Sequence, residues 1–240
     1  MGRIITIANQ KGGVGKTTTA INLSACLAEA GQHVMLVDFD PQGNASSGLG
    51  VEKEDYEHTV YDMMAEEADL DECLVKNIQD NLDVLPSDMN LAGAEIEFQE
   101  VEDKETLLKR YLDKVRDNYD FILIDCPPSL NILTINALTA ADTVLVPIQC
   151  EYYALEGLNQ VLKTVELVKR KLNPQLELEG VVFTMYDART NLSLQVVESV
   201  KNNLNQTIYK TIIPRNVRLA EAPSHGMPIN LYDTRSTGAE

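Results

Sequence analysis

Residues 3–18 read Arg-Ile-Ile-Thr-Ile-Ala-Asn-Gln-Lys-Gly-Gly-Val-Gly-Lys-Thr-Thr and decide the fold of the chain. The apolar, β-branched run at 4–8 is typical of a buried parallel strand. A glycine-rich loop follows, and from Thr17 apolar residues recur at helical spacing as far as Gly31, which predicts the helix end. This order predicts a cradle for phosphate groups, because glycines let backbone N–H groups converge and a helix N-terminus carries partial positive charge.

The loop predicts nucleotide binding. Lys16 can reach the β- and γ-phosphates, and the Thr17 hydroxyl can ligate Mg²⁺. The common motif G-x-x-x-x-G-K-[ST] is not matched at its first position, where Gln10 stands, and a second lysine, Lys11, follows it. Two ammonium groups repel each other, so Lys11 either reaches a nucleotide held by a partner subunit or is a solvated loop charge. The residues expected to contact the nucleotide here are Lys11, Gly12, Gly13, Val14, Gly15, Lys16, Thr17 and Thr18.

Two further apolar runs, 33–38 and 120–125, predict buried strands that deliver carboxylates to the same edge of a sheet. The second run ends at Asp125, a Walker B arrangement that places one carboxylate beside Mg²⁺. The first leads to Asp40, which could orient or deprotonate the attacking water or hold Mg²⁺ through water. The alternative for Asp40 is an aspartate that caps the turn before Pro41.

The 240 residues are 44% hydrophobic and 24% charged, which suits one α/β domain over 1–240. Helical patterns alternate with strand-like runs, which predicts a doubly wound, mainly parallel sheet flanked by helices; the later runs are 82–86, 142–148, 178–185 and 207–213. Residues 51–117 are expected to be mostly helical with a solvated acidic face. No apolar run is long enough to span a membrane. The four cysteines lack metal-site spacing and are expected to be buried thiols in a reducing cytoplasm.

The formal net charge of −17 is unevenly distributed. Residues 51–120 hold 22 Asp and Glu against 7 Lys and Arg, whereas residues 184–240 hold 5 against 6. Because local potential decides a binding face, duplex DNA is permitted as a partner, although composition does not argue for it. The candidates for contacts to the DNA backbone are Arg189, Arg215, Arg218 and Arg235. The alternative is that each is solvated or ion-paired.

Six segments spread over nearly the whole chain carry a resemblance to a known family: KGGVGKTT, DFDPQGN, DCPPS, QCEYYALEG, MYDART and IPRNVRLAEAPSHG. The set resembles the ParA/MinD group of ATPases, and within it the chromosomal ParA proteins of the Soj type more closely than MinD. The resemblance implies a P-loop NTPase with a deviant Walker A motif that uses ATP or ADP and Mg²⁺. Lys11 would act across an ATP-sandwiched dimer.

The resemblance also implies roles for individual residues. The catalytic set would be Lys11, Lys16 and Asp40, and the metal set would be Thr17, Asp40 and Asp125. Pro214 and Asn216 would contact the base, with simple strand termination as the alternative. Among the arginines, Arg189 and Arg218 are favoured for DNA contact.

The function that the resemblance implies is a slow ATPase that binds duplex DNA nonspecifically as an ATP-bound dimer. It would serve chromosome or plasmid partitioning with a ParB-type partner, in the cytoplasm and on the nucleoid. The alternatives are a MinD-like membrane-associated ATPase and a small-molecule ligase resembling dethiobiotin synthetase. Family members usually continue past the segment 232–240 into a last helix, which leaves open any function that this helix supports.

Overall fold

The structure is a computed structural model that describes residues 1–204 and 207–239, with the side chains of all of these except 95 and 99. Within this part of the chain one eight-stranded sheet has the order β3-β4-β2-β5-β1-β6-β7-β8. Its strands are β1 Arg3–Ile7, β2 Val34–Asp38, β3 Val75–Gln79, β4 Leu82–Leu85, β5 Phe121–Asp125, β6 Thr143–Gln149, β7 Glu177–Tyr186 and β8 Ile208–Pro214. All neighbouring pairs are parallel except β3 with β4.

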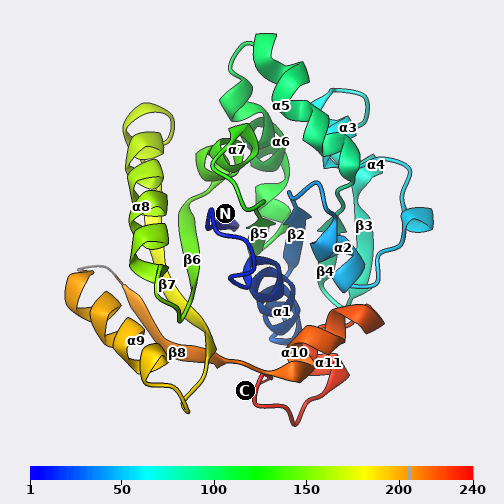
Figure 1. The fold of residues 1–240 in the computed structure, drawn as a ribbon. Helices are drawn as coiled ribbons and strands as arrows, with labels where there is room; N and C mark the ends of the chain where they lie inside the picture. Colours follow the sequence, from blue (N-terminus) through cyan, green and yellow to red (C-terminus); the bar gives the residue numbers. More distant parts are fainter. Residues whose placement is uncertain (205–206, 240) are drawn as a thin grey trace.

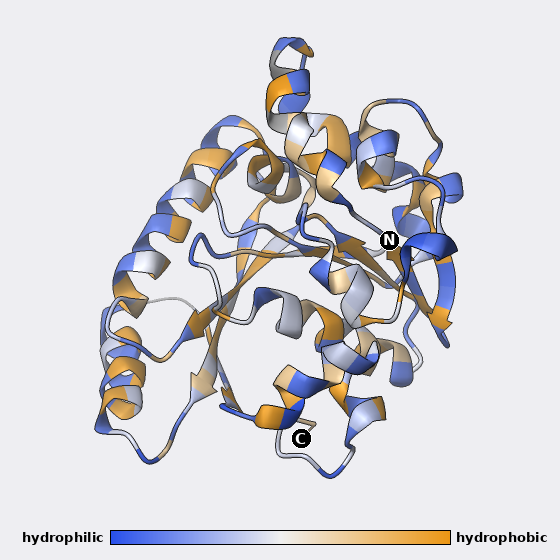
Figure 2. Ribbon diagram, turned by 45° about the vertical axis from the view of Figure 1, so that its right-hand side comes forward, coloured by the Kyte–Doolittle hydropathy of each residue, from blue (hydrophilic) through white to orange (hydrophobic). Residues whose placement is uncertain are grey.

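Helices cover both faces of this sheet (Figure 1). They are α1 Lys16–Glu29, α2 Asn44–Gly48, α3 Val60–Met64, α4 Leu70–Cys73, α5 Ala94–Glu97, α6 Leu107–Val115, α7 Ile132–Ala140, α8 Ala154–Lys171, α9 Asn191–Asn203, α10 Val217–Glu221 and α11 Ile229–Tyr232. Short 3-10 turns lie at Lys53–Asp55, Met89–Gly93, Phe98–Glu100, Lys104–Thr106, Arg116–Asn118 and Ala222–His225. Figure 2 shows hydrophobic strands in the middle of the molecule and helices with hydrophilic outer faces. None of the described helices is both long and apolar enough to cross a membrane.

The central strands send alternate side chains into two separate cores. On β5, Ile122 and Ile124 belong to the larger core, which α6, α7 and α8 close, whereas Leu123 belongs to the smaller core under α1. Ile4 and Ile5 of β1 divide in the same way. Because both faces are buried, the central strands read as continuous apolar runs. The predicted doubly wound, mainly parallel sheet is confirmed.

The connections open a crevice at the carboxyl ends of the central strands. The chain passes from β5 through α7 to β6, and these two strands lie on either side of β1. Loops after β1, β2 and β5 therefore meet at one edge of the sheet, where ligands of open α/β sheets bind.

The sequence missed one strand, and one of its expectations was wrong. The stretch expected to be mostly helical contains β3, an antiparallel edge strand whose sequence Val-Lys-Asn-Ile-Gln shows no alternation. Asn77 interrupts it with a left-handed φ of 56°, which breaks the period on which the sequence argument depends. Cys26 was expected to be buried but is exposed on α1, whereas Cys73, Cys126 and Cys150 are buried as predicted.

Candidate functional site

The loop between β1 and α1 takes its shape from two glycines. Gly13 has a φ of 73° and Gly15 a φ of 86°, and Gly15 is the N-cap of α1. A side chain in this left-handed region is strained, so the sequence needs glycine at both positions. Gly12 is different, because its φ is not left-handed and a Cβ there would meet only the Pro128 Cβ, at 3.8 Å. The backbone of this exposed loop can therefore approach a phosphate closely.

Two buried polar side chains tie the loop to the sheet. Asn9 donates from Nδ2 to the Pro147 carbonyl at 2.8 Å and accepts the Lys11 amide on Oδ1 at 3.0 Å. Thr184 on β7 donates from Oγ1 to the Val14 carbonyl at 2.8 Å. The loop is thus held at both ends before any ligand binds. Sequence reasoning missed both anchors, because they join residues more than 130 positions apart.

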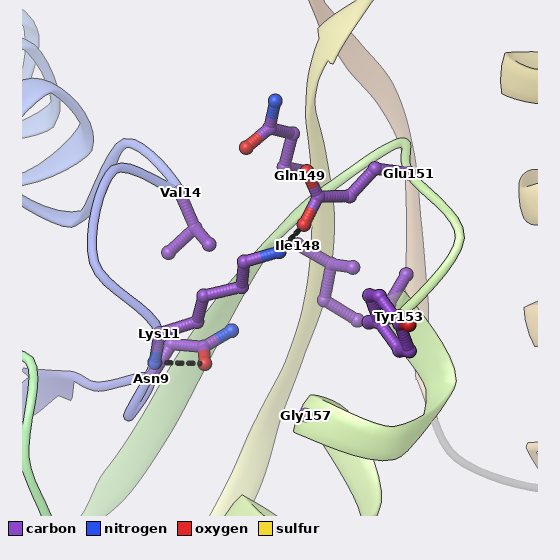
Figure 3. Close-up of a pocket in the computed structure, with 9 residues that line it drawn as sticks. Asn9, Lys11, Val14, Ile148, Gln149, Glu151, Tyr153 and Gly157 are labelled. Atoms are coloured by element: carbon purple, nitrogen blue, oxygen red, sulfur yellow. Dashed lines mark hydrogen bonds and ion pairs between the residues drawn. The ribbon is translucent and has the colours of Figure 1, made fainter.

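The two lysines of the loop contact different groups. Lys16 is buried and donates from Nζ to the Lys11 carbonyl at 3.1 Å. Its burial lowers the pKa of the ammonium group, while the nearby Asp125 carboxylate raises it by a smaller amount. The Lys11 side chain instead forms an ion pair with Glu151, which follows β6 (Figure 3). Lys16 therefore lies inside its own site, and Lys11 is directed away from it.

Asp125 ends β5 and is completely buried. Among the described residues, neither of its carboxylate oxygens accepts a well-formed hydrogen bond. Burial and the charge of Asp38 raise its pKa well above the usual range, and the nearby Thr17 hydroxyl and Lys16 ammonium lower it by less. A buried carboxylate with so little hydrogen bonding is unfavourable unless a cation compensates its charge. The donor set of Asp125 and Thr17 consists of hard oxygens, which suits Mg²⁺.

Asp38 lies beside Asp125 as its register partner on β2. Its carboxylate accepts the Ser46 amide and hydroxyl, both at 2.8 Å, and so holds the start of α2. Burial raises the pKa of Asp38 to about 6. Sequence analysis read Asp38 only as the end of a strand, although the pattern of an apolar run ending in aspartate is the one that identified Asp125.

Asp40 follows two residues after Asp38 and is 7% exposed. It accepts the Gln42 amide on Oδ1 at 3.0 Å, and its own amide donates to Asp38 at 3.3 Å. The turn contact expected for Asp40 is therefore present. It leaves the second carboxylate oxygen available for a water molecule or a cation.

The carboxyl end of β8 lies along the same edge of the sheet, three strands away from β1. Pro214 ends β8, and Asn216 caps α10 by accepting the amides of Arg218 and Leu219, at 2.7 and 3.3 Å. The Asn216 amide nitrogen donates to Ser236 and Thr237, at 2.9 and 3.0 Å. Both of its donors and its acceptor are occupied, so contact with a base would require some of these bonds to be exchanged.

Both favoured arginines form ion pairs. Arg189, in the loop after β7, is 86% exposed and makes two hydrogen bonds to Asp187, at 2.9 and 2.7 Å. Arg218 on α10 contacts Glu221 at 2.8 Å and Asp233 at 3.5 Å. The positive charge of Arg218 is therefore compensated by two carboxylates, whereas that of Arg189 is compensated by one.

The C-terminal segment is fastened to α1. The Ile229 amide donates to Asn22 Oδ1 at 2.7 Å, and Asn230 Nδ2 donates to Glu29 at 2.8 Å. Both acceptors belong to α1, which begins with Lys16.

Residues 2–178 match the family described as AAA domain. Over 240 residues the chain is 61% identical to the sporulation initiation inhibitor protein Soj of Bacillus subtilis, covering 100% of this chain and 95% of that protein. The chain belongs to the Soj/ParA family of P-loop ATPases.

Two further comparisons agree with this assignment. The chromosome-partitioning ATPase Soj of Treponema pallidum is 52% identical over 239 residues, which cover 100% of this chain and 93% of that protein. A crystal structure of cobyrinic acid a,c-diamide synthase from Mycobacterium smegmatis, with a bound ATP analogue and magnesium, superimposes with a TM-score of 0.85. That chain is 36% identical, and the match covers 98% of each chain. The protein is an ATPase with the predicted P-loop fold.

Proposed function

We propose that this ATPase is a positional switch in chromosome or plasmid partitioning, which closes as a dimer on ATP and binds duplex DNA in that state. The observation that carries the proposal is the convergence of Lys16, Asp40 and the buried Asp125 around one glycine loop. Similarity to the chromosome-partitioning ATPase Soj of Treponema pallidum supports the partitioning context.

The nucleotide would lie on the loop from Lys11 to Thr18, with its phosphates at the N-terminus of α1. Lys16 would exchange the Lys11 carbonyl for the β- and γ-phosphates. Thr17 and Asp125 would hold Mg²⁺, with Asp40 contributing through water. The metal would neutralise charge on the phosphate oxygens. Pro214 and Asn216 remain the candidates for the base, and the occupied amide of Asn216 favours Pro214 of the two.

Hydrolysis needs a water molecule aligned with the γ-phosphate. Asp40 is suited to orient that water, because one of its oxygens is fixed by Gln42 and the other is available. Lys16 and the partner's Lys11 would stabilise the charge that develops on the phosphate oxygens.

The closed dimer would bind DNA through paired basic surfaces that include Arg189 and Arg218. Two weak faces that act together bind with high avidity, so opening the dimer releases DNA without altering any single contact. A ParB-type partner bound at centromere-like sites would stimulate hydrolysis and reset the switch. These steps would take place in the cytoplasm, on the nucleoid.

Binding of duplex DNA would be measured with ATP, ADP or no nucleotide, at two salt concentrations. The variants are Lys16→Ala, Asp40→Ala and Arg189→Ala. We expect wild-type binding to require ATP and to weaken with salt, and Asp40→Ala to stay bound longer. Lys16→Ala should abolish binding. Arg189→Ala should lower the slope of affinity against salt by about one phosphate contact per subunit.

Two results would redirect the assignment. If the Asp40→Ala variant forms a nucleotide-bound dimer that ignores DNA but sediments with lipid vesicles, the membrane-associated alternative holds. If ATP turnover depends on a small-molecule substrate and ignores DNA, the ligase alternative holds.

A further inference from the structure

The ion pair between Lys11 and Glu151 joins the glycine loop to the segment between β6 and α8. Both side chains are about one-third exposed. In Figure 3 Lys11 extends from the loop toward the carboxylate of Glu151, with Val14 and Tyr153 nearby. The lysine that would serve a partner's nucleotide is thus already bound to a carboxylate of its own subunit.

The two sides of this pair differ in how much space they leave to the lysine. The Lys11 amide is held by Asn9, so the backbone from which the side chain extends is fixed. The side chains around the pair leave a cavity of about 10 Å³, which is barely room for one water molecule. On its other side Lys11 lines a larger groove of about 490 Å³, which Glu156 also lines. The Lys11 backbone is therefore fixed, whereas its ammonium group has room to leave Glu151.

We propose that Glu151 is a positioning residue that holds Lys11 in the single subunit and must release it before two subunits close. The inference deepens the proposed function and rests on it, because Lys11 matters to closure only if it crosses to the partner's phosphates. Glu151 competes with those phosphates for one ammonium group, and after release its charge opposes nearby phosphate. Glu151 would thereby raise the nucleotide occupancy and protein concentration at which the dimer forms.

The exposure of the Lys11–Glu151 ion pair sets how strongly it can oppose dimerisation. A partly exposed ion pair is weak, so a polyphosphate with several negative charges can displace Glu151. Two such pairs break for each dimer, and their loss should strengthen dimer association by about twofold to thirtyfold. The effect should shrink as salt screens the pair.

The test is dimerisation with ATP, measured by sedimentation over a range of protein concentrations. The Asp40→Ala background is used so that hydrolysis does not deplete the complex. Glu151→Gln is compared with Glu156→Gln. Glu156 belongs to the first turn of α8 and lines the neighbouring groove, but within the described part of the chain it forms no ion pair with Lys11. We expect Glu151→Gln to lower the dimer Kd by the stated factor at low salt and by less at high salt. Glu156→Gln should leave it within about twofold, because an exposed charge without a close partner contributes little.

Glu151→Asp is the second variant. It keeps the charge on a shorter side chain and should lie between wild type and Glu151→Gln. Unchanged or weaker dimerisation in Glu151→Gln, with unfolding at the wild-type denaturant concentration, would overturn the role of Glu151. A salt-independent gain would also overturn it, since that result indicates a packing effect. If neither the parent nor any variant dimerises with ATP, the proposed function itself fails, which is a distinguishable outcome.

Discussion

Asp38 and Asp125 stand opposite each other as register partners on β2 and β5, and both carboxylates are completely buried. Asp38 is satisfied by Ser46, whereas neither oxygen of Asp125 accepts a well-formed bond within the described residues. Two acids so placed cost the nucleotide-free protein stability at neutral pH. That cost has measurable consequences.

Replacing Asp125 should separate stability from function. Asp125→Asn removes a buried charge, so we expect the nucleotide-free protein to gain about 1 kcal/mol in free energy of unfolding. Magnesium-dependent nucleotide binding should be lost. Urea unfolding and calorimetric titration with MgATP measure the two effects. Asp117→Asn, at an exposed position, is the control and should change neither. A destabilised Asp125→Asn protein would contradict this account.

The pKa of Asp38 gives the pH dependence of the same effect. Its pKa of about 6 in the folded state lies above the ordinary aspartate pKa of 3.8, so the folded state holds the proton to a higher pH than the unfolded state does. Stability from this group therefore falls as pH rises from about 4 to 6, by at most about 3 kcal/mol. The gain in unfolding free energy from Asp38→Asn should accordingly be larger at pH 7.5 than at pH 5, without nucleotide or Mg²⁺. A gain that is equal at the two pH values would argue against a raised pKa.

Thr184→Val tests the anchor of the glycine loop. The substitution keeps the shape but leaves the buried Val14 carbonyl without its donor, which should cost about 1–3 kcal/mol. Nucleotide affinity should fall as well, because the loop is less organised before binding. Thr143→Val is a matched control on β6, since the Thr143 hydroxyl is buried without a hydrogen-bond partner among the described residues. Its removal should be neutral or stabilising, and equal losses in the two variants would refute the anchor.

Gly12 and Gly13 should differ sharply when each is replaced by valine. A Cβ at Gly12 makes only an ordinary van der Waals contact with Pro128, so the melting temperature of Gly12→Val should stay within about 2 °C of wild type. Closure of the dimer should nevertheless fail, because a branched side chain would lie beside the phosphates. Gly13→Val places a β-branched residue at a φ of 73° and should lose about 1–2 kcal/mol. Thermal unfolding and ATP-dependent sedimentation distinguish the two. Normal dimerisation of Gly12→Val would contradict the proposed closure.

The sequence alone predicted those features that are defined by residues close together in the chain. The run of strand, glycine loop and helix predicts β1, the loop and α1 because each is defined by residues close together in the chain. Asp40 and Asp125 were found because each follows an apolar strand, and parallel strands bring their ends to one edge. The family resemblance rests on such local segments too.

Contacts between distant segments were beyond sequence reasoning. Glu151 was read only as part of a motif, and its ion pair with Lys11 depends on how β6 lies against the loop. The full set of bonds made by Asn216 depends on residues twenty positions away. β3 was missed because an exposed edge strand does not need the apolar alternation that identifies a buried one.

The hydrogen bonds from Ile229 and Asn230 to α1 have one more consequence. α1 begins with Lys16 and Thr17, where the phosphates are proposed to bind. Its later turns carry Asn22 and Glu29, which accept the hydrogen bonds from the C-terminal segment. A tilt of α1 on a bound nucleotide would move these two acceptors, and with them the segment that contains Ile229 and Asn230. Arg218 would change its position without contacting the nucleotide.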